Sequence, residues 1–310
     1  MTEISVIIPT YNRASFLERA LRSVQRQTLV CDEIIVIDDG SVDNTKDCVN
    51  DFSAKCNIPV RYISQSNQGP AAARNRGIRE SRFSYLAFLD SDDHWQKKKL
   101  ALQYAALVEK PKVMIAHTKE RWLRRGIHLN QKKIHQPGNG DIFKHCLQLC
   151  AVGMSTVMVK KELFAEIGLF KEDMPCCEDY DLWLRTSSRF PFLLLDNPLT
   201  IKEGGREDQV SYQFRIGMDR LRIRAIVDLL QEQSLSTEQT IWTLEELRRK
   251  CTVYGKGCLK HKRMTEGQSY IELAKWAVSL LDKSFSLPID VPENPAGIIK
   301  FSEKQPMVYA

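Results

Sequence analysis

Short apolar runs alternate with segments of helical periodicity over the first 120 residues of the chain. The helical segments carry apolar side chains at helical spacing, as at Leu17, Leu21 and Val24. Strands that are apolar on both faces and separated by helices are typical of a parallel sheet covered by helices. We therefore predict an α/β fold with the apolar runs as its strands. These runs cover residues 4–8, 34–37, 60–63, 85–89 and 113–116.

The pattern loosens in the second half of the chain. We expect helices at 141–150 and from Glu178 onward, and short strands at 155–159, 192–195 and 199–202. Three helical segments follow, near 215–232, 237–262 and 266–283, and prolines mark the end of the chain. The predicted organisation is an α/β domain over 1–212, a helical region over 213–285 and an extended tail over 286–310.

The composition narrows the class of protein. Hydrophobic residues make up 43% and charged residues 27% of 310 residues, which excludes a disordered chain, a collagen-like fibre and a disulfide miniprotein. No apolar run approaches the ~20 residues that span a bilayer, and the first residues do not resemble a signal peptide. The nine cysteines include no C-x-x-C, so we expect reduced thiols in a cytoplasmic protein.

Polar segments directly follow several of the predicted strands. Ligands of open α/β sheets bind outside the carboxyl ends of the strands, so we expect these segments to form one site. The segments are Pro9-Thr10-Tyr11-Asn12-Arg13, Asp38-Asp39-Gly40-Ser41 and Asp90-Ser91-Asp92-Asp93.

The acidic segments offer two kinds of chemistry. Asp90 and Asp92, at i and i+2 beyond a buried strand, can reach one cation, and Mg²⁺ typically takes one or two carboxylates plus substrate phosphates. An acidic surface turn is the alternative. Asp39 can accept a hydrogen bond from a nucleoside, or it can simply form a turn with Gly40 and Ser41.

Two predicted helix starts carry further candidates. Gly69-Pro70 opens an alanine-rich helix whose N-terminus attracts anions, and Arg74, one turn in, could reach a phosphate or a base. Glu178, Asp179 and Asp181 crowd the start of a later helix, where the helix dipole keeps a general base ionised. For Asp181 we prefer simple placement at the positive helix end. Trp183 could stack on an acceptor sugar or lie in the core.

Taken in order, these segments resemble glycosyltransferase family 2 over roughly residues 3–211. The resemblance implies the GT-A (Rossmann-like) fold with a C-terminal helical extension. It also implies inverting transfer from a nucleoside-diphosphate sugar, which we expect to be UDP-linked, to a saccharide or lipid-linked acceptor, assisted by Mg²⁺ or Mn²⁺. By resemblance, Asp179 would be the catalytic base with Glu178 beside it. The donor would be bound by Pro9, Thr10, Tyr11, Arg13, Asp39, Arg74, Asp90 and Ser91, and the cation by Asp92 and Asp90.

The chain departs from the family pattern in two places. Many relatives carry a histidine near a Gln-x-Ser after the second catalytic helix, where this chain has Arg206. Arg206 could supply positive charge directly, and with Trp183 it is also a candidate acceptor contact. The Gln-x-x-Arg-Trp element of processive synthases is absent, because Arg121-Trp122 precedes the Glu178-Asp179 pair. Non-processive addition of one sugar is therefore expected.

Other classes of function fit less well. A sugar nucleotidyltransferase would need a glycine-rich signature with Arg and Lys after the first strand, and Pro9-Thr10-Tyr11-Asn12-Arg13 lacks it. A nucleotide-sugar-binding protein without transferase activity stays open because of Arg206. Basic residues interleaved with aromatics on a nucleic-acid-binding module are not visible, so no nucleic-acid partner is expected. The oligomeric state is not predicted.

The net charge of +6 is concentrated in one stretch. Residues 119–135 carry six Lys and Arg side chains against Glu120 alone, a net +5. We predict a mobile basic loop beside the active site that contacts an anionic acceptor or, peripherally, the inner face of the membrane. A solvated loop is an equally open interpretation. The six basic residues are Lys119, Arg121, Arg124, Arg125, Lys132 and Lys133.

Overall fold

The computed structural model describes residues 2–232 and 234–281. The chain divides into two compact units, one up to Ile216 and one from Gly217 onward. The domain boundary at 212/213 stays a prediction, and the expected tail over 286–310 lies outside the described residues.

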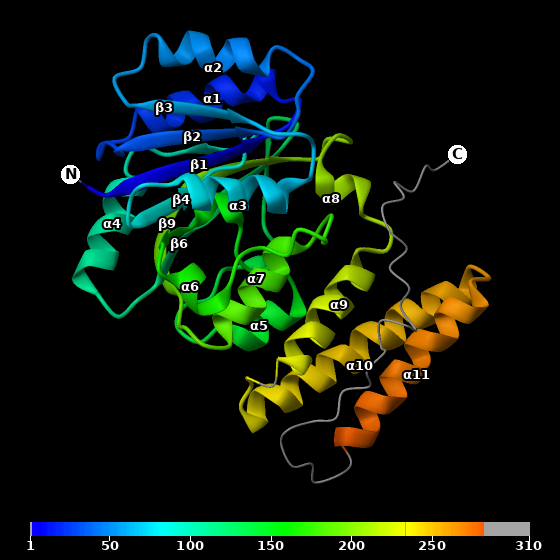
Figure 1. The fold of residues 1–310 in the computed structure, drawn as a ribbon. Helices are drawn as coiled ribbons and strands as arrows, with labels where there is room; N and C mark the ends of the chain where they lie inside the picture. Colours follow the sequence, from blue (N-terminus) through cyan, green and yellow to red (C-terminus); the bar gives the residue numbers. More distant parts are fainter. Residues whose placement is uncertain (1, 233, 282–310) are drawn as a thin grey trace. The chain divides into compact units, whose positions relative to one another are not determined.

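The first half of the first unit is a parallel sheet with helices on both faces (Figure 1). The strands lie in the order β3-β2-β1-β4, and β1 and β2 are buried along their whole length. The alternating apolar runs therefore form the predicted strands and helices here. The elements are β1 (Ile4–Thr10), α1 (Ala14–Gln25), β2 (Glu33–Asp38), α2 (Thr45–Ser53), β3 (Val60–Ser64), α3 (Pro70–Glu80) and β4 (Tyr85–Phe88).

Successive side chains of the strands serve opposite faces of the sheet, as strand geometry requires. Val6 and Val36 belong to a core shared with α1 and α2, where Leu17 packs. Ile35 and Ile37 pack on the other face against α3. The sheet holds the N-terminus of α3 at the same edge as the ends of β1, β2 and β4, which is where the polar segments lie.

The second half of the sheet is mixed, whereas the parallel pattern predicted from the first 120 residues holds for β1 to β4. β8 (Met158–Lys160) is antiparallel to β4 and to β6 (Ile115–Arg124). β9 (Leu193–Gly204) is parallel to β6 and antiparallel to β5 (His94–Trp95). The two short strands expected at 192–195 and 199–202 are one strand, because Pro198 between them pairs with Lys119, and shifts of register on either side of Lys119 accommodate the extra residues of β9.

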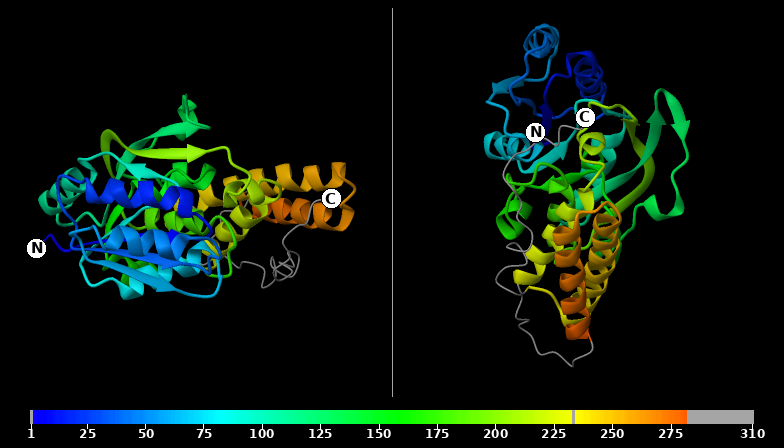
Figure 2. Two further views of the ribbon diagram at one scale, coloured as in Figure 1. Left: turned by 90° about the horizontal axis from the view of Figure 1, so that it is seen from above. Right: turned by 90° about the vertical axis from the view of Figure 1, so that its right-hand side faces the viewer.

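Residues 119–129 of the basic stretch form a β-hairpin, where a loop was expected, and a short 3₁₀ turn follows at Lys133–His135. Residues 119–124 continue β6 because they pair with β9 as far as Gly204. Arg125 and Gly126 form the turn at φ 52° and 77°, a conformation that glycine adopts without strain. β7 (Ile127–Leu129) then pairs back onto β6, and Figure 2 shows this hairpin beside β9.

Helices complete both units. The first unit also has α4 (Lys99–Glu109), α5 (Phe143–Gln148), α6 (Leu163–Ile167), α7 (Glu178–Ser187), α8 (Val210–Gln213) and short 3₁₀ turns at Lys133–His135 and Met154–Thr156. The described part of the second unit contains α9 (Met218–Gln231), α10 (Thr237–Lys260) and α11 (Met264–Leu281). Their bounds lie within a few residues of the three helical segments predicted from the sequence. In the part of the chain that the structure describes, no helix combines the length and apolarity of a membrane span.

Close packing of α3 on β1 depends on Gly77. A methyl group at this position would overlap Ile7 Cγ2 in a fully buried strand. We expect Gly77→Ala to lower the free energy of unfolding by about 1–3 kcal/mol, measured by chemical denaturation. Gly257→Ala in α10 is the control, because a methyl group there meets no atom within 4 Å. It should leave stability unchanged or raise it by about 0.5–1 kcal/mol. Equal losses in both variants would contradict the packing argument.

Candidate active site

Arg74 joins the two halves of the site. It lies one turn into α3 and is only 6% exposed. Its Nη2 donates to Asp90 Oδ1 at 2.8 Å, and its Nη1 donates to Glu178 Oε1 at 2.5 Å, 104 residues away along the chain. The structure therefore brings together three of the segments that the sequence singled out.

The charges in this cluster stabilise one another. Burial lowers the pKa of Arg74, but Asp90 and Glu178 raise it by more, so the guanidinium stays charged. Burial raises the pKa of Glu178, Arg74 lowers it and Asp179 raises it, and the net shift is upward. Glu178 therefore depends on Arg74 to remain a carboxylate in this buried place.

Asp39 fixes the start of α3. Its carboxylate accepts hydrogen bonds from the backbone N–H groups of Gln68 at 3.0 Å and Gly69 at 2.7 Å. Gln65 Nε2 adds a third bond at 2.8 Å. Asp39, predicted to contact the donor, thus also has a structural role, because its hydrogen bonds fix the start of the helix that carries Arg74. Its binding to a nucleoside stays a prediction.

The loop after β1 supplies the other predicted donor residues. Pro9 and Thr10 are buried at the end of the strand, and Thr10 Oγ1 has no partner among the described residues. Tyr11 is 46% exposed at the same edge. Arg13 forms an ion pair with Asp208 and also donates to the Asp208 carbonyl at 2.7 Å.

Asp92 is held by two residues of the segment that follows β9. Its Oδ2 accepts from Arg206 Nη2 and from Gln209 Nε2, the latter at 3.1 Å. Arg19 Nη2 donates to the Asp92 carbonyl at 2.8 Å. Arg206, a candidate acceptor contact from the sequence, therefore lies against the carboxylate that was expected to bind the cation.

The predicted cation ligands do not fit a cation site as they stand. Asp90 is paired with Arg74, and Asp92 is paired with Arg206. Among the described residues, no group of three or more His, Cys, Asp or Glu side chains could hold a metal ion. A cation at Asp92 would have to draw its remaining ligands from elsewhere and share the carboxylate with a guanidinium.

Ser155 holds the turn of residues 90–93, called the acidic turn below, through two hydrogen bonds. Ser155 Oγ accepts from the Asp90 N–H at 3.0 Å and donates to Asp93 Oδ2 at 2.7 Å. Ser91 and Asp93 are buried, and Asp93 Oδ1 also accepts from the Glu203 N–H at 3.1 Å. Burial and the neighbouring Asp92 raise the pKa of Asp93 well above its usual range. Ser155 lies in an apolar stretch with no motif, so sequence inspection missed it.

Asp179 lies at the start of α7, next to Cys177 in the left-handed conformation at φ 64°. Its Oδ1 accepts from the Tyr180 N–H at 2.7 Å, and its Oδ2 accepts from the Cys150 thiol at 3.2 Å. Burial and Asp179 raise the pKa of Cys150 well above its usual value, so the thiol is a neutral, weak donor. Glu178 is engaged with Arg74, whereas Asp179 Oδ2 accepts only this weak hydrogen bond among the described residues.

Two residues of α7 are structural. Trp183 is 1% exposed, donates to the Val152 carbonyl at 2.9 Å and packs edge-on against Phe192. The ring cannot stack on an acceptor sugar, so of the two interpretations left open by the sequence the core position is correct. Asp181 is buried and paired with Arg185 at 2.6 Å.

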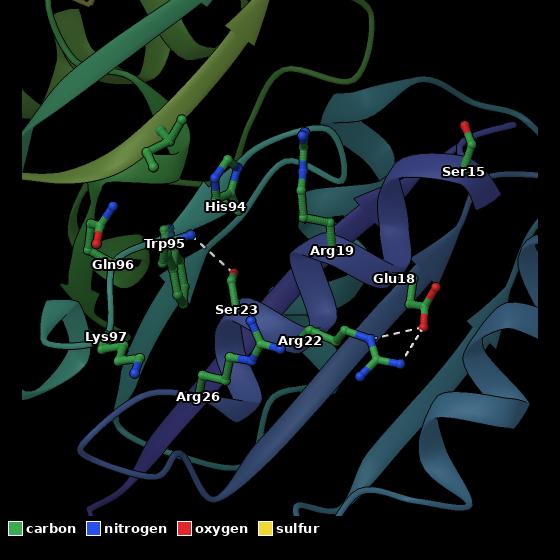
Figure 3. A pocket seen from close by; sticks show the side chains of 11 residues that line it. Ser15, Glu18, Arg19, Arg22, Ser23, Arg26, His94, Trp95, Gln96 and Lys97 are labelled. Atoms are coloured by element: carbon green, nitrogen blue, oxygen red, sulfur yellow. Dashed lines mark hydrogen bonds and ion pairs between the residues drawn. The ribbon is translucent and has the colours of Figure 1, made fainter. Parts of the chain in front are cut away.

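A pocket of about 420 Å³ lies beside the acidic turn (Figure 3). Side chains of α1, including Arg19, form one wall, and residues 94–97 form the other. None of the predicted site residues lines it. Arg19 connects the pocket to the site, because the same side chain holds the Asp92 carbonyl and forms an ion pair with Glu203 at 2.6 Å.

Comparison with known proteins decides the family. The family model described as "Glycosyl transferase family 2" matches residues 5–167, more than half of the chain. The chain belongs to glycosyltransferase family 2. An uncharacterized glycosyltransferase of Rickettsia conorii is 37% identical over 192 residues, which cover 61% of this chain and 30% of that protein. The Bacillus subtilis protein named as teichuronic acid biosynthesis glycosyltransferase TuaG is 31% identical over 182 residues, 58% of this chain and 70% of its own.

Solved structures confirm the GT-A fold. Residues 1–349 of S. aureus TarS, in complex with UDP-GlcNAc, align with a TM-score of 0.68 and 19% identity, covering 88% of this chain and 79% of that one. The mannosyltransferase PcManGT of Pyrobaculum calidifontis, in complex with GDP-Man and Mn²⁺, aligns with a TM-score of 0.61 and 15% identity, covering 96% of this chain and 78% of that one. The matched residues span about a third or less of the rickettsial relatives.

Removal of Arg74 should expose its role in holding the carboxylates. Arg74→Met leaves Glu178 and Asp90 without their shared cation, so we expect a loss of about 3–5 kcal/mol at neutral pH by chemical denaturation. Without Arg74 the raised pKa of Glu178 rises further. A carboxyl group whose pKa is raised on folding stabilises the folded state at low pH, where it is protonated, and this contribution disappears as the pH rises. The loss of stability in Arg74→Met should therefore be smaller at about pH 5 than at neutral pH.

The control for this change is Arg76→Met on the same helix. Arg76 is half exposed and pairs with Glu80 at the surface. It should change stability by no more than about 0.5 kcal/mol at either pH. A pH-independent loss in Arg74→Met would contradict the role of the carboxylates.

Proposed function

We propose that this protein is an inverting, non-processive glycosyltransferase. It moves one sugar from a nucleoside-diphosphate sugar to a hydroxyl of a saccharide or lipid-linked acceptor. The observation that carries the proposal is the meeting of Asp90 and the Glu178-Asp179 pair around Arg74 at the carboxyl edge of the sheet. Family membership and the names of TuaG and TarS support it.

Arginine side chains lie on the donor side of the site, where a diphosphate would bind. Arg13 and Arg206 contact the same residue, Asp208, and the N-terminus of α3 opens at the same edge. Guanidinium groups and helix N-termini both bind phosphate oxygens. We propose a UDP-linked donor, supported by the TarS structures in complex with UDP-GlcNAc and UDP. PcManGT, by contrast, was solved with GDP-Man.

The chemistry is a single displacement. Asp179 Oδ2 takes the proton of the acceptor hydroxyl as that oxygen bonds to the anomeric carbon of the sugar. The bond between the anomeric carbon and the diphosphate oxygen breaks on the opposite face, and its electron pair leaves with the diphosphate. Arg74 keeps Glu178 in place beside Asp179, and the nearby guanidinium groups stabilise the charge that grows on the leaving diphosphate.

A divalent cation, Mg²⁺ or Mn²⁺, stays a prediction for this chain. PcManGT was solved with Mn²⁺. When bound, such a cation would neutralise diphosphate charge, with Asp92 and donor phosphates as its ligands. The present pairing of Asp92 with Arg206 does not fit that arrangement.

The β6–β7 hairpin is the proposed contact with an anionic membrane surface. The stretch 119–135, which begins in this hairpin, carries a net +5 of the chain's +6. Arg124 and Arg125 are exposed at the turn, and Ile127 and Leu129 are 74% and 43% exposed beside them. Basic side chains next to exposed apolar ones suit a phospholipid headgroup region. Such a contact would hold the enzyme near a lipid-linked acceptor.

The catalytic assignment is tested with Asp179→Asn. Asparagine keeps the shape of the side chain but cannot accept the proton, so the turnover rate should fall roughly 10²–10⁴-fold with the thermal midpoint nearly unchanged. Donor consumption is measured by release of the nucleoside diphosphate.

Asp181→Asn on the same helix is the matched control. Asp181 is buried between Arg185 and Lys171, at 2.6 and 2.9 Å. Its replacement should lower stability by about 3–5 kcal/mol while the folded fraction still turns over donor. Normal turnover in Asp179→Asn would remove the assignment of the base.

Membrane contact is tested by charge reversal at the hairpin. We expect Arg124→Glu with Arg125→Glu to weaken sedimentation with phosphatidylglycerol vesicles about tenfold or more, since each basic residue contributes about 1 kcal/mol near an anionic surface. Lys110→Glu with Lys112→Glu makes the same charge change at exposed positions after α4 and should have a much smaller effect. Equal binding by both double variants and the unmodified protein would favour a merely solvated hairpin.

A further inference from the structure

The guanidinium of Arg206 occupies the place beside Asp92 that a cation would need. Nη2 of Arg206 donates to Asp92 Oδ2, and Gln209 Nε2 donates to the same oxygen at 3.1 Å. Two donors thus converge on the carboxylate oxygen that the family resemblance assigns to a metal ion. A divalent cation at this oxygen would lie against a fixed positive charge, and the two would repel each other.

The position of Arg206 is set by several independent contacts. Its Nε lies 3.3 Å from Asp208 Oδ1, and its backbone N–H donates to Gln209 Oε1 at 3.2 Å. The guanidinium carbon lies 4.2 Å from the centre of the Phe16 ring, a cation–π contact from α1. Side chains from α1, the acidic turn and the segment after β9 therefore hold this cation in one orientation.

One nitrogen of the group is left without an acceptor. Nη1 of Arg206 is buried and has no hydrogen-bond partner among the described residues. Buried donors in proteins are nearly always paired, so an orphaned N–H in a polar site points to a missing acceptor. An arginine whose Nη2 and Nε are fixed by carboxylates presents Nη1 in a set direction, and a phosphate oxygen is the acceptor that a guanidinium binds best.

We propose that Arg206, oriented by Asp92, binds the donor diphosphate in place of a divalent cation, so that nucleotide binding by this chain does not require a metal ion. This inference rests on the proposed function, because it assumes a nucleoside-diphosphate donor. The acceptor of the orphaned N–H is a phosphate oxygen of the donor. Asp92 acts here as a positioning residue for Arg206, not as a metal ligand.

The test is calorimetric titration of the full chain with UDP, and with GDP in parallel, in EDTA and in Mn²⁺. The unmodified protein should bind the nucleotide in EDTA with a Kd within about threefold of that in Mn²⁺. Arg206→Ala should bind it about tenfold or more weakly in EDTA, because a charged hydrogen bond to phosphate is lost. Arg206→His, which offers a metal ligand, should regain affinity only when Mn²⁺ is added.

Arg76→Ala is the matched control, since it removes a surface arginine that is also paired with a carboxylate. Its Kd should equal that of the unmodified protein in both media. Binding by the unmodified protein that appears only with Mn²⁺ would overturn the role of Arg206 and leave the proposed function standing. Failure of both nucleotides to bind in either medium would overturn the proposed function, and the inference with it.

Discussion

The buried ion pairs of Arg74 with Asp90 and Glu178 are the interaction on which the site depends. The guanidinium comes from α3, one carboxylate follows β4, and the other begins α7. Arg74 and Glu178 would each be costly to bury alone, whereas Asp90 is partly exposed. Removal of one partner of a buried pair usually destabilises more than the pair stabilises. The parallel strands place Arg74 and Asp90 at one edge of the sheet, and the ion pair with Glu178 then holds the start of α7, with Asp179, against them.

The edge location was predictable because it follows from local signals. Apolar runs that end in Asp38-Asp39 and Asp90-Ser91-Asp92 mark strand ends, and parallel strands share an edge. Partners far apart in sequence were not predictable. Nothing near Asp92 indicates Arg206, 114 residues away, because their meeting depends on the path of β9. The direction of the three-residue strand β8 and the pairing that makes residues 119–124 a strand are likewise set by distant partners. The residues around Trp183 in the sequence do not distinguish a tryptophan packed in the core from one that faces a ligand.

Arginines pair with several of the carboxylates in this site. Arg74 serves Asp90 and Glu178, Arg206 serves Asp92 and Asp208, and Arg13 reaches Asp208 from the loop after β1. A guanidinium stays charged at any physiological pH and presents fixed donors, so it can hold a carboxylate and still offer an N–H to a phosphate. Arg206, at the position where many relatives carry a histidine, is therefore consistent with the other arginine–carboxylate pairs of the site.

In the proposed reaction, the bond that breaks is the one between the anomeric carbon and the diphosphate. Combined ¹H and ³¹P NMR of the protein with UDP- and GDP-linked sugars and saccharide acceptors tests it directly. The account predicts that nucleoside diphosphate appears as the donor's anomeric signal is replaced by one of opposite configuration. Formation of sugar 1-phosphate, retention of configuration, or an unchanged donor with every acceptor would contradict it.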